Sequence, residues 1–401
     1  MKKELGVLWL VVFISLMGFG VTTVPFPLVT EQMGASDFWK TFGGAGVFSV
    51  FQLIATPLWG RYSDAVGRKP ILLLSLAGSV LAYVWLAYAN DLVSLLVARA
   101  FGGIMSGNLS AAFAYATDVT DVKNRARGLG IISSAFGLGF AIGPPLGGLL
   151  GTAADGSASL YWPALLSAAL ALLALIGTWL LLRESLPVEM RRPMGAAPIE
   201  AAGGGTSFAA IFSKPVLVGL MAAALVVSIG GSAMQSVYQF WARDLFAYSL
   251  QDVGFQFMAF AICTATGQAL LIGPLVRRFG EKRVALAATA GVTIGLLLFA
   301  AAMHPVLVWA AIIVFGTSQG LFTPAVTSLV SFEADPRSRG TVMGAFNSAS
   351  SSGRVIGPAV SGPLYFTFGH TAPFLFSAVL TVAGGLMLLR ARPAAQSAAR
   401  P

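Results

Sequence analysis

One short connection decides the fold, and it reads Gly60-Arg61-Tyr62-Ser63-Asp64-Ala65-Val66-Gly67-Arg68-Lys69-Pro70. It places four charges and two glycines between two apolar runs that are too long for the core helices of a soluble domain. Glycine lets the backbone turn sharply, and charged side chains require water. The stretch therefore predicts a tight, solvated turn between two membrane-spanning helices.

The composition of the whole chain also indicates a membrane protein. Of the 401 residues, 56% are hydrophobic and only 10% are charged, which is too apolar for a soluble protein. A spanning helix needs about 20 apolar residues. Twelve such segments are present, and they begin near Leu5, Thr41, Ile71, Leu92, Arg127, Leu160, Val216, Val253, Val284, Val306, Thr341 and Ala372. The predicted fold class is an all-α membrane protein with twelve transmembrane helices in two six-helix bundles.

The basic residues predict the orientation of these helices. Most of the 25 Lys and Arg residues fall in loops and tails that share one side with both chain ends, and cytoplasmic loops carry such an excess. We therefore expect both termini in the cytoplasm and the chain in the inner (plasma) membrane. The net charge of +9 reflects this topology, so no nucleic-acid partner is expected. Cys263 is the only cysteine of the sequence, so no internal disulfide is expected. His304 and His370 are far apart in the sequence, so no metal site or cofactor is expected.

The two halves of the chain repeat each other at a shift of about 213 residues. Gly60 falls on Gly273 and Gly67 on Gly280. This duplication predicts bundles at residues 1–182 and 215–401, with a substrate site near the midplane between them. Residues 183–214 form the predicted central linker, which is charged at first and then rich in Ala and Gly.

A glycine pattern marks the fifth apolar segment. Small residues at these spacings let two helices approach closely, and a proline bends the span. The pattern consists of Gly130, Gly139, Gly143, Pro144, Gly147 and Gly148. One residue later in register than the first repeat, all of these positions except Gly147 are matched in the second half, by Gly344, Gly353, Gly357, Pro358 and Gly362.

Polar residues inside the spans are candidates for function. Arg99 lies about six residues inside the fourth segment, where a charge is costly unless it faces water or a partner. Its alternative is a side chain that snorkels to the outer interface. The candidates for the substrate pathway lie in the second half, and they are Gln235, Tyr238, Gln239, Trp241, Gln319, Asn347, Ser351 and Arg354. Their alternative is to make polar contacts between helices without touching substrate.

Together these features resemble the major facilitator superfamily of secondary transporters, in its drug:proton antiporter branch of bacterial tetracycline and multidrug efflux proteins. The resemblance implies a rocker-switch mechanism, in which two halves expose a central site alternately to each side. It implies that Arg99 couples protonation to the conformational change. It also implies that the glycine pattern lets the fifth helix pack closely enough to prevent leak through the transporter. The implied cytoplasmic gate consists of Gly60, Asp64, Gly67, Arg68, Lys69 and Asp118. Within it, Arg68 would pair with Asp118, and Asp64 would touch the start of the eleventh helix.

The sequence departs from the tetracycline exporters at one position. Ser15 stands where those proteins carry an acid, and all 16 acids of this chain fall in loops or near span ends. The candidates that remain for carrying a proton are Asp64, Asp118, Glu31, Asp37 and Asp244.

The predicted function is export of a small amphipathic, drug-like molecule in exchange for protons, by a monomer within the lipid bilayer. One alternative is a transporter of an organic anion that Arg99 and Arg354 bind. Another is a non-transporting receptor or scaffold, against which the charged turn and the glycine pattern argue. An enzyme is not expected, because no nucleophile and base pair, metal cluster or phosphate loop is recognisable.

Overall fold

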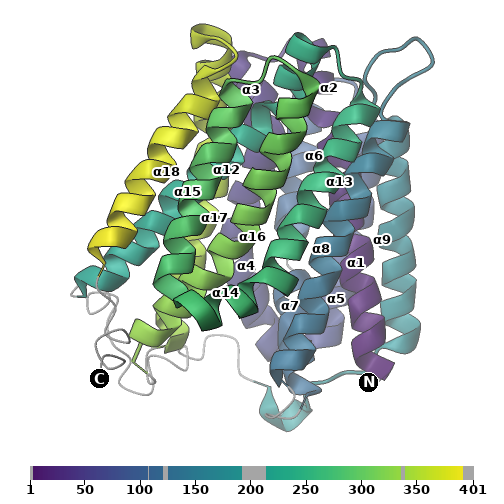
Figure 1. Cartoon of the computed structure of the whole chain (residues 1–401). Helices are drawn as coiled ribbons and strands as arrows, with labels where there is room; N and C mark the ends of the chain where they lie inside the picture. The colour runs from purple at the N-terminus through teal and green to yellow at the C-terminus, as the bar shows by residue number, and fades with distance from the viewer. Residues whose placement is uncertain (1–2, 107, 121–124, 192–213, 336–338, 392–401) are drawn as a thin grey trace, which may run out of the picture. The chain divides into compact units, whose positions relative to one another are not determined.

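The computed structural model describes residues 3–106, 108–120, 125–191, 214–335 and 339–391 (Figure 1). Long helices make up nearly all of these residues, and the β-pairing found among them is one isolated bridge between Thr152 and Ala158. The predicted all-α fold class is confirmed.

The chain divides into two compact units. The first comprises Met1–Ala196 and Ala242–Met258, and the second comprises Ala197–Trp241 and Ala259–Pro401. This division differs from the predicted halves because residues 242–258 group with the first unit. Most of the predicted linker, residues 192–213, lies outside the described residues.

The first unit contains the helices of the first six predicted spans. They are α1 (Lys3–Thr23), α2 (Phe26–Gln32), α3 (Asp37–Thr41), the π-helix η1 (Phe42–Gly46), α4 (Val47–Val66), α5 (Arg68–Ala87), α6 (Leu92–Met105), α7 (Asn108–Asp118), α8 (Arg125–Leu150) and α9 (Tyr161–Leu181), followed by a short 3-10 helix, η3 (Val188–Met190). The first span breaks near its far end, where Val24 and Pro25 form a turn. The fourth span also breaks, because α6 ends before Ser106 and α7 begins at Asn108.

The remaining helices follow the linker. They are α12 (Pro215–Phe246), α13 (Leu250–Thr266), the π-helix η4 (Gly267–Leu271), α14 (Ile272–Phe279), α15 (Glu281–Ala300), α16 (Pro305–Glu333), α17 (Arg339–Phe368) and α18 (Ala372–Arg390). The division between the units passes through α12 and α13, so residues 242–246 and 250–258 of these helices belong to the first unit.

The lengths and hydropathies of the helices support the predicted spans. Among the described residues, 11 helical segments are long and apolar enough to cross a membrane. The twelfth predicted span is α17, whose 30 residues are long enough to cross. Its apolar surface is interrupted by several serines, Asn347 and Arg354, which explains why α17 is absent from that set.

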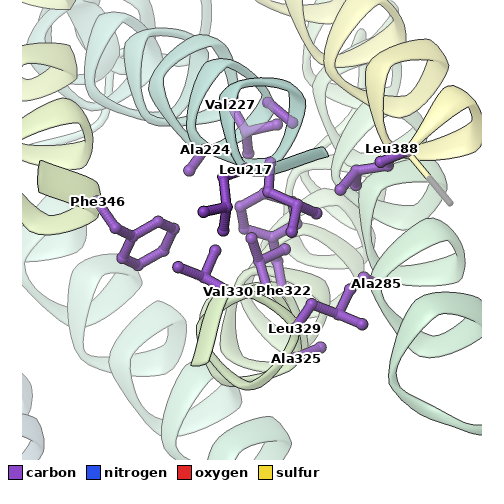
Figure 2. Close-up of a cluster of buried hydrophobic side chains, with 14 of the residues drawn as sticks. Leu217, Ala224, Val227, Ala285, Phe322, Ala325, Leu329, Val330, Phe346 and Leu388 are labelled. Atoms are coloured by element: carbon purple, nitrogen blue, oxygen red, sulfur yellow. The ribbon is translucent and has the colours of Figure 1, made fainter. Parts of the chain in front are cut away.

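Each unit has its own apolar core. In the first, α1 packs against both α8 and α9 (Figure 1), and Leu8, Leu72 and Ile132 are fully buried. In the second, α15 packs against α16 and α18. Figure 2 shows the second core, where Leu217, Ala224 and Val227 of α12 meet side chains of α15, α16, α17 and α18. Their spacing of three and seven residues places them on one face of α12, which explains why α12 is buried along that face.

Candidate functional site

The turn after α4 carries an ion-pair network that we call the latch, formed by Ser63, Asp64, Arg68 and Asp118. Gly67 makes the turn with φ = 118°, a conformation that only glycine adopts readily, whereas Gly60 lies inside α4. The next residue, Arg68, is 9% exposed. Its guanidinium contacts Asp64 at 2.5 Å, Ser63 at 2.9 Å and Asp118 at 3.1 Å.

The pairing of Arg68 with Asp118 that the family resemblance implied is therefore present. The implied contact of Asp64 with the start of the eleventh span concerns residues near 336–338, which lie outside the described residues.

Glu184, which is not one of the four latch residues, stabilises the turn that carries the latch. The sequence analysis did not identify it. Its carboxylate accepts the backbone N–H groups of Arg68 at 2.9 Å and Lys69 at 3.1 Å. These N–H groups begin α5 and have no partner within the helix, so the negative charge stabilises the helix N-terminus. The following residue, Ser185, donates to Asp118 at 3.1 Å, while the Lys69 ammonium donates to the Trp179 carbonyl at 2.8 Å. The available signal was topological, because an acid that directly follows the sixth span lies at the same end as the latch.

The second copy of this turn keeps its backbone shape but not its charges. Gly280 has φ = 80° and separates α14 from α15, as Gly67 separates α4 from α5. Arg277 and Glu281 stand where the first copy has Asp64 and Arg68. Within the described part of the chain neither forms an ion pair, and no side chain caps the start of α15. The place is instead an open cavity of about 420 Å³, lined by Ile272, Gly273, Val276, Arg277, Glu281, Pro324, Ala325 and Ser328.

Arg99 on α6 is enclosed rather than exposed. Only 3% of it is accessible, and its guanidinium donates to the Thr22 hydroxyl at 3.1 Å. The guanidinium carbon lies 4.8 to 5.8 Å from the ring centres of three phenylalanines, which attract a cation through their π faces. These rings belong to Phe19, Phe26 and Phe48. The Nε group of Arg99 has no hydrogen-bond partner among the described residues.

The glycine pattern of α8 lies mainly against α1. A Cβ atom at Gly139 or Gly143 would come within 3.0 Å of the α1 backbone. At Gly147 it would collide with the Val21 carbonyl. Gly148 faces the start of α13, and a Cβ at Gly130 would meet nothing within 4 Å. These glycines let the backbones of α8 and α1 approach closely, and α8 runs unbroken through Pro144.

The corresponding α12–α17 interface is joined by serines. On α12, Ser228 donates to the Ser350 carbonyl at 2.7 Å and Ser232 to the Gly353 carbonyl at 2.8 Å. One turn further along, the hydroxyls of Ser236 and Ser361 lie 2.7 Å apart.

The predicted pathway residues occupy two different environments. On α12, Gln235 is half-buried, and Tyr238, Gln239 and Trp241 are buried. Trp241 packs against Phe299 and Phe374. The side-chain oxygens of Gln239 on α12 and Gln319 on α16 are buried without a hydrogen-bond partner among the described residues.

The pathway residues of α17 are more open. Asn347 and Arg354 are exposed and Ser351 is half-buried. The Arg354 guanidinium donates to the Ser351 hydroxyl at 2.9 Å. Arg354 lies near the middle of a helix of 30 residues, where a charge facing lipid would be costly.

No group of three or more His, Cys, Asp or Glu side chains in the described ranges could hold a metal ion.

Comparisons with known proteins identify the family. The sequence model of the Major Facilitator Superfamily matches residues 8–357 and 220–401. The tetracycline resistance protein, class C, of Escherichia coli is 30% identical over 364 residues, which cover 90% of this chain and 89% of that protein.

Solved structures of transporters share the fold. The human organic anion transporter MFSD10 aligns with a TM-score of 0.72 at 23% identity, over 96% of this chain and 99% of that one. The nucleoside transporter NupG aligns with a TM-score of 0.77 at 16% identity, over 97% and 98% of the two chains. These matches leave no support for a receptor or scaffold. The chain belongs to the Major Facilitator Superfamily and is a multi-pass membrane transporter rather than an enzyme.

Proposed function

We propose that this transporter exports a small amphipathic, drug-like molecule across the inner membrane by alternating access, in exchange for protons, and that it works as a monomer. The latch carries this proposal. Arg68 is held by several side chains from separate segments, an arrangement that can form in one state of a cycle and separate in another. The similarity to a tetracycline resistance protein supports export of a drug-like substrate.

The proposed orientation follows from the distribution of positive charge. Both termini and the latch lie in the cytoplasm, because the loops that share their side carry most of the 25 basic residues. In this orientation the latch closes the cytoplasmic side of the transporter. The residues of the proposed gate are Gly60, Asp64, Gly67, Arg68, Lys69 and Asp118.

Arg99 is proposed to couple protonation to conformation. Its cation is stabilised by aromatic rings and one hydroxyl, and no carboxylate pairs with it among the described residues. The position of the guanidinium would therefore change when a neighbouring group gains or loses a proton. Because Thr22 and two of the rings belong to α1 and α2, a change at Arg99 is transmitted directly to the first span.

Dye accumulation in efflux-deficient cells tests the export proposal. We expect the intact protein to lower accumulation of a cationic dye, Asp64→Asn to abolish this effect, and Arg354→Ala to preserve it. Glu281→Gln, on the unpaired copy of the turn, is the matched control and should behave as the intact protein. Equal activity of Asp64→Asn and the intact protein would remove the latch from the mechanism.

Purified protein in liposomes tests the coupling ion. If substrate is exchanged for protons, substrate transport should be faster when a pH gradient drives protons in the direction opposite to the substrate. Equal rates with and without the gradient would exclude it.

Arg354 favours a second candidate function, the transport of an organic anion. An exposed guanidinium in the middle of a spanning helix, beside Asn347 and Ser351, offers positive charge and hydrogen-bond donors to a carboxylate or sulfonate. Arg99 is less suited to bind the anion directly, since it is enclosed by aromatic rings. Selective movement of an anionic dye that Arg354→Ala abolishes would establish this candidate in place of the first.

A further inference from the structure

A second group of charges lies in the first unit, at the end opposite the latch. The chain leaves the N-terminal end along α1 and returns to the latch along α4, so the segment between them lies at the far end. Five charged residues meet there, and we call them the Glu31 cluster: Glu31, Asp37, Lys40, Arg243 and Asp244.

Glu31 and Arg243 form the centre of this cluster. The Arg243 guanidinium reaches both carboxylate oxygens of Glu31, through a short contact of Nη1 and a longer one of 3.4 Å from Nη2. The Glu31 side chain is only 27% exposed. Such a two-point ion pair, partly withdrawn from water, is more strongly held than an exposed pair.

Each member of the central pair also has a second partner close to it in the chain. The Arg243 Nε lies 2.9 Å from the carboxylate of Asp244, its neighbour in sequence. The Lys40 ammonium lies 4.0 Å from Glu31 and 3.0 Å from Asp37. If Arg243 moves away from Glu31, it keeps Asp244, and Glu31 can draw Lys40 closer.

The path of α12 explains why Arg243 could move away from Glu31. Arg243 lies two residues after Trp241, which is the last residue of α12 in the second unit. On the opposite side, Glu31 lies on the seven-residue helix α2, between the turn at Pro25 and Gly34, whose φ of 72° ends that helix segment. The Glu31–Arg243 pair therefore fastens the end of a helix that continues into the second unit.

We propose that the Glu31–Arg243 pair is a clasp on the outer side of the transporter, closed here and released when the outer side opens, with Lys40 taking over Glu31 on release. This inference rests on the proposed alternating access. Breaking an ion pair is costly when it leaves a charge without a partner. Lys40 and Asp244 lower that cost, and the clasp can open and close repeatedly.

The distance between α2 and the end of α12 tests the clasp without any substrate. Nitroxide labels at Ser36→Cys and Ala247→Cys, both exposed positions, are introduced after Cys263→Ser removes the only native cysteine. Pulsed electron spin resonance in liposomes then gives the ratio of long to short distances.

Two substitutions are expected to act in opposite directions. Glu31→Gln weakens the closed clasp and should raise the ratio of long to short distances about fivefold. Lys40→Gln leaves Glu31 without its substitute partner after release and should lower the ratio about twofold. A static ion-pair network predicts instead that both substitutions loosen the contact. An unchanged ratio for Glu31→Gln, or a rise for Lys40→Gln, would overturn the proposal.

Asp155→Asn is the matched control. Asp155 lies in the loop between α8 and α9 at the same end of the unit, since Gly151 in that loop lies beside Pro25. Hydrogen bonds from Ser157 hold the pKa of Asp155 below its ordinary value, so the substitution removes one real negative charge outside the cluster. The distance ratio should stay unchanged. If Glu31→Gln and Lys40→Gln shift the distances as expected but the intact protein moves no dye, the clasp stands and the proposed export fails.

Discussion

The first and second copies of the same turn differ in chemistry while sharing a backbone. Both place a glycine with positive φ between two helices, Gly67 in one and Gly280 in the other. The first turn holds Arg68 among Ser63, Asp64 and Asp118, whereas the second borders an open cavity. The comparison teaches that duplication preserved the backbone turn, and that of the two turns only the first holds a charged latch among the described residues.

The largest expected effect breaks the latch at its centre. Arg68→Ala removes the buried guanidinium that contacts Ser63, Asp64 and Asp118 together, so the ends of α4 and α7 lose their shared partner. We expect dye export to fall by at least about tenfold. Arg277→Ala, in the second copy, is the control and should export at nearly the normal rate. Equal losses in both variants would show that the second turn also works as a gate.

The glycine interfaces should behave alike in the two units, in contrast to the turns. A Cβ at Gly143 would lie 2.7 Å from the Met17 carbonyl, and one at Gly357 would lie 2.6 Å from the Ile229 carbonyl. Gly143→Ala and Gly357→Ala should each cost about 2–3 kcal/mol by overpacking, measured by thermal unfolding in detergent. Gly130→Ala is the control, because its Cβ would meet open space. A harmless substitution at either interface would contradict the close approach of the helices there.

The turn glycines should show a graded difference. Alanine is strained at both positive-φ positions, at about 1–3 kcal/mol each. At Gly67 the new Cβ would also come within 2.5 Å of the Glu184 carboxylate that caps α5, whereas no side chain caps the start of α15 after Gly280. Gly67→Ala should therefore lower the unfolding temperature further than Gly280→Ala. The opposite order would mean that Glu184 moves aside freely.

The smallest effect concerns the helix start that Glu184 stabilises. Glu184→Gln weakens the cap of α5, and such a cap contributes about 1 kcal/mol. Hydrogen exchange at the first turn of α5 should accelerate, and exchange at the first turn of α15, which has no side-chain cap, should stay the same. If the hydrogen-exchange rate at the first turn of α5 is unchanged in Glu184→Gln, then packing rather than the Glu184 cap stabilises that turn.

Much of the fold could be predicted from the sequence, because its signals are local. Apolar length gave the spans, and Gly67 marked the turn that the structure shows. The fourth span was predicted as one helix, but α6 ends at Met105. This break could not be foreseen, since Ser106 and Gly107 are compatible with continuing a membrane helix.

The candidate site was less accessible from the sequence. Arg99 stood out as a charge within a span, yet its surroundings come from Phe19, Phe26 and Phe48 in three other helical segments. Glu184 acts on Arg68 across more than a hundred residues of chain. No spacing rule links such positions, because tertiary packing brings them together.

The polarity of α17 affects how the chain is made. A segment is accepted into the bilayer during synthesis according to its own hydropathy, and an arginine near its centre adds about 2.5–3.5 kcal/mol to that cost. α17 carries Arg354 at such a position and packs against α16 and α18. Its entry into the membrane therefore depends on these flanking helices, and a nascent chain that stops after α17 would hold this helix less securely than the finished protein does.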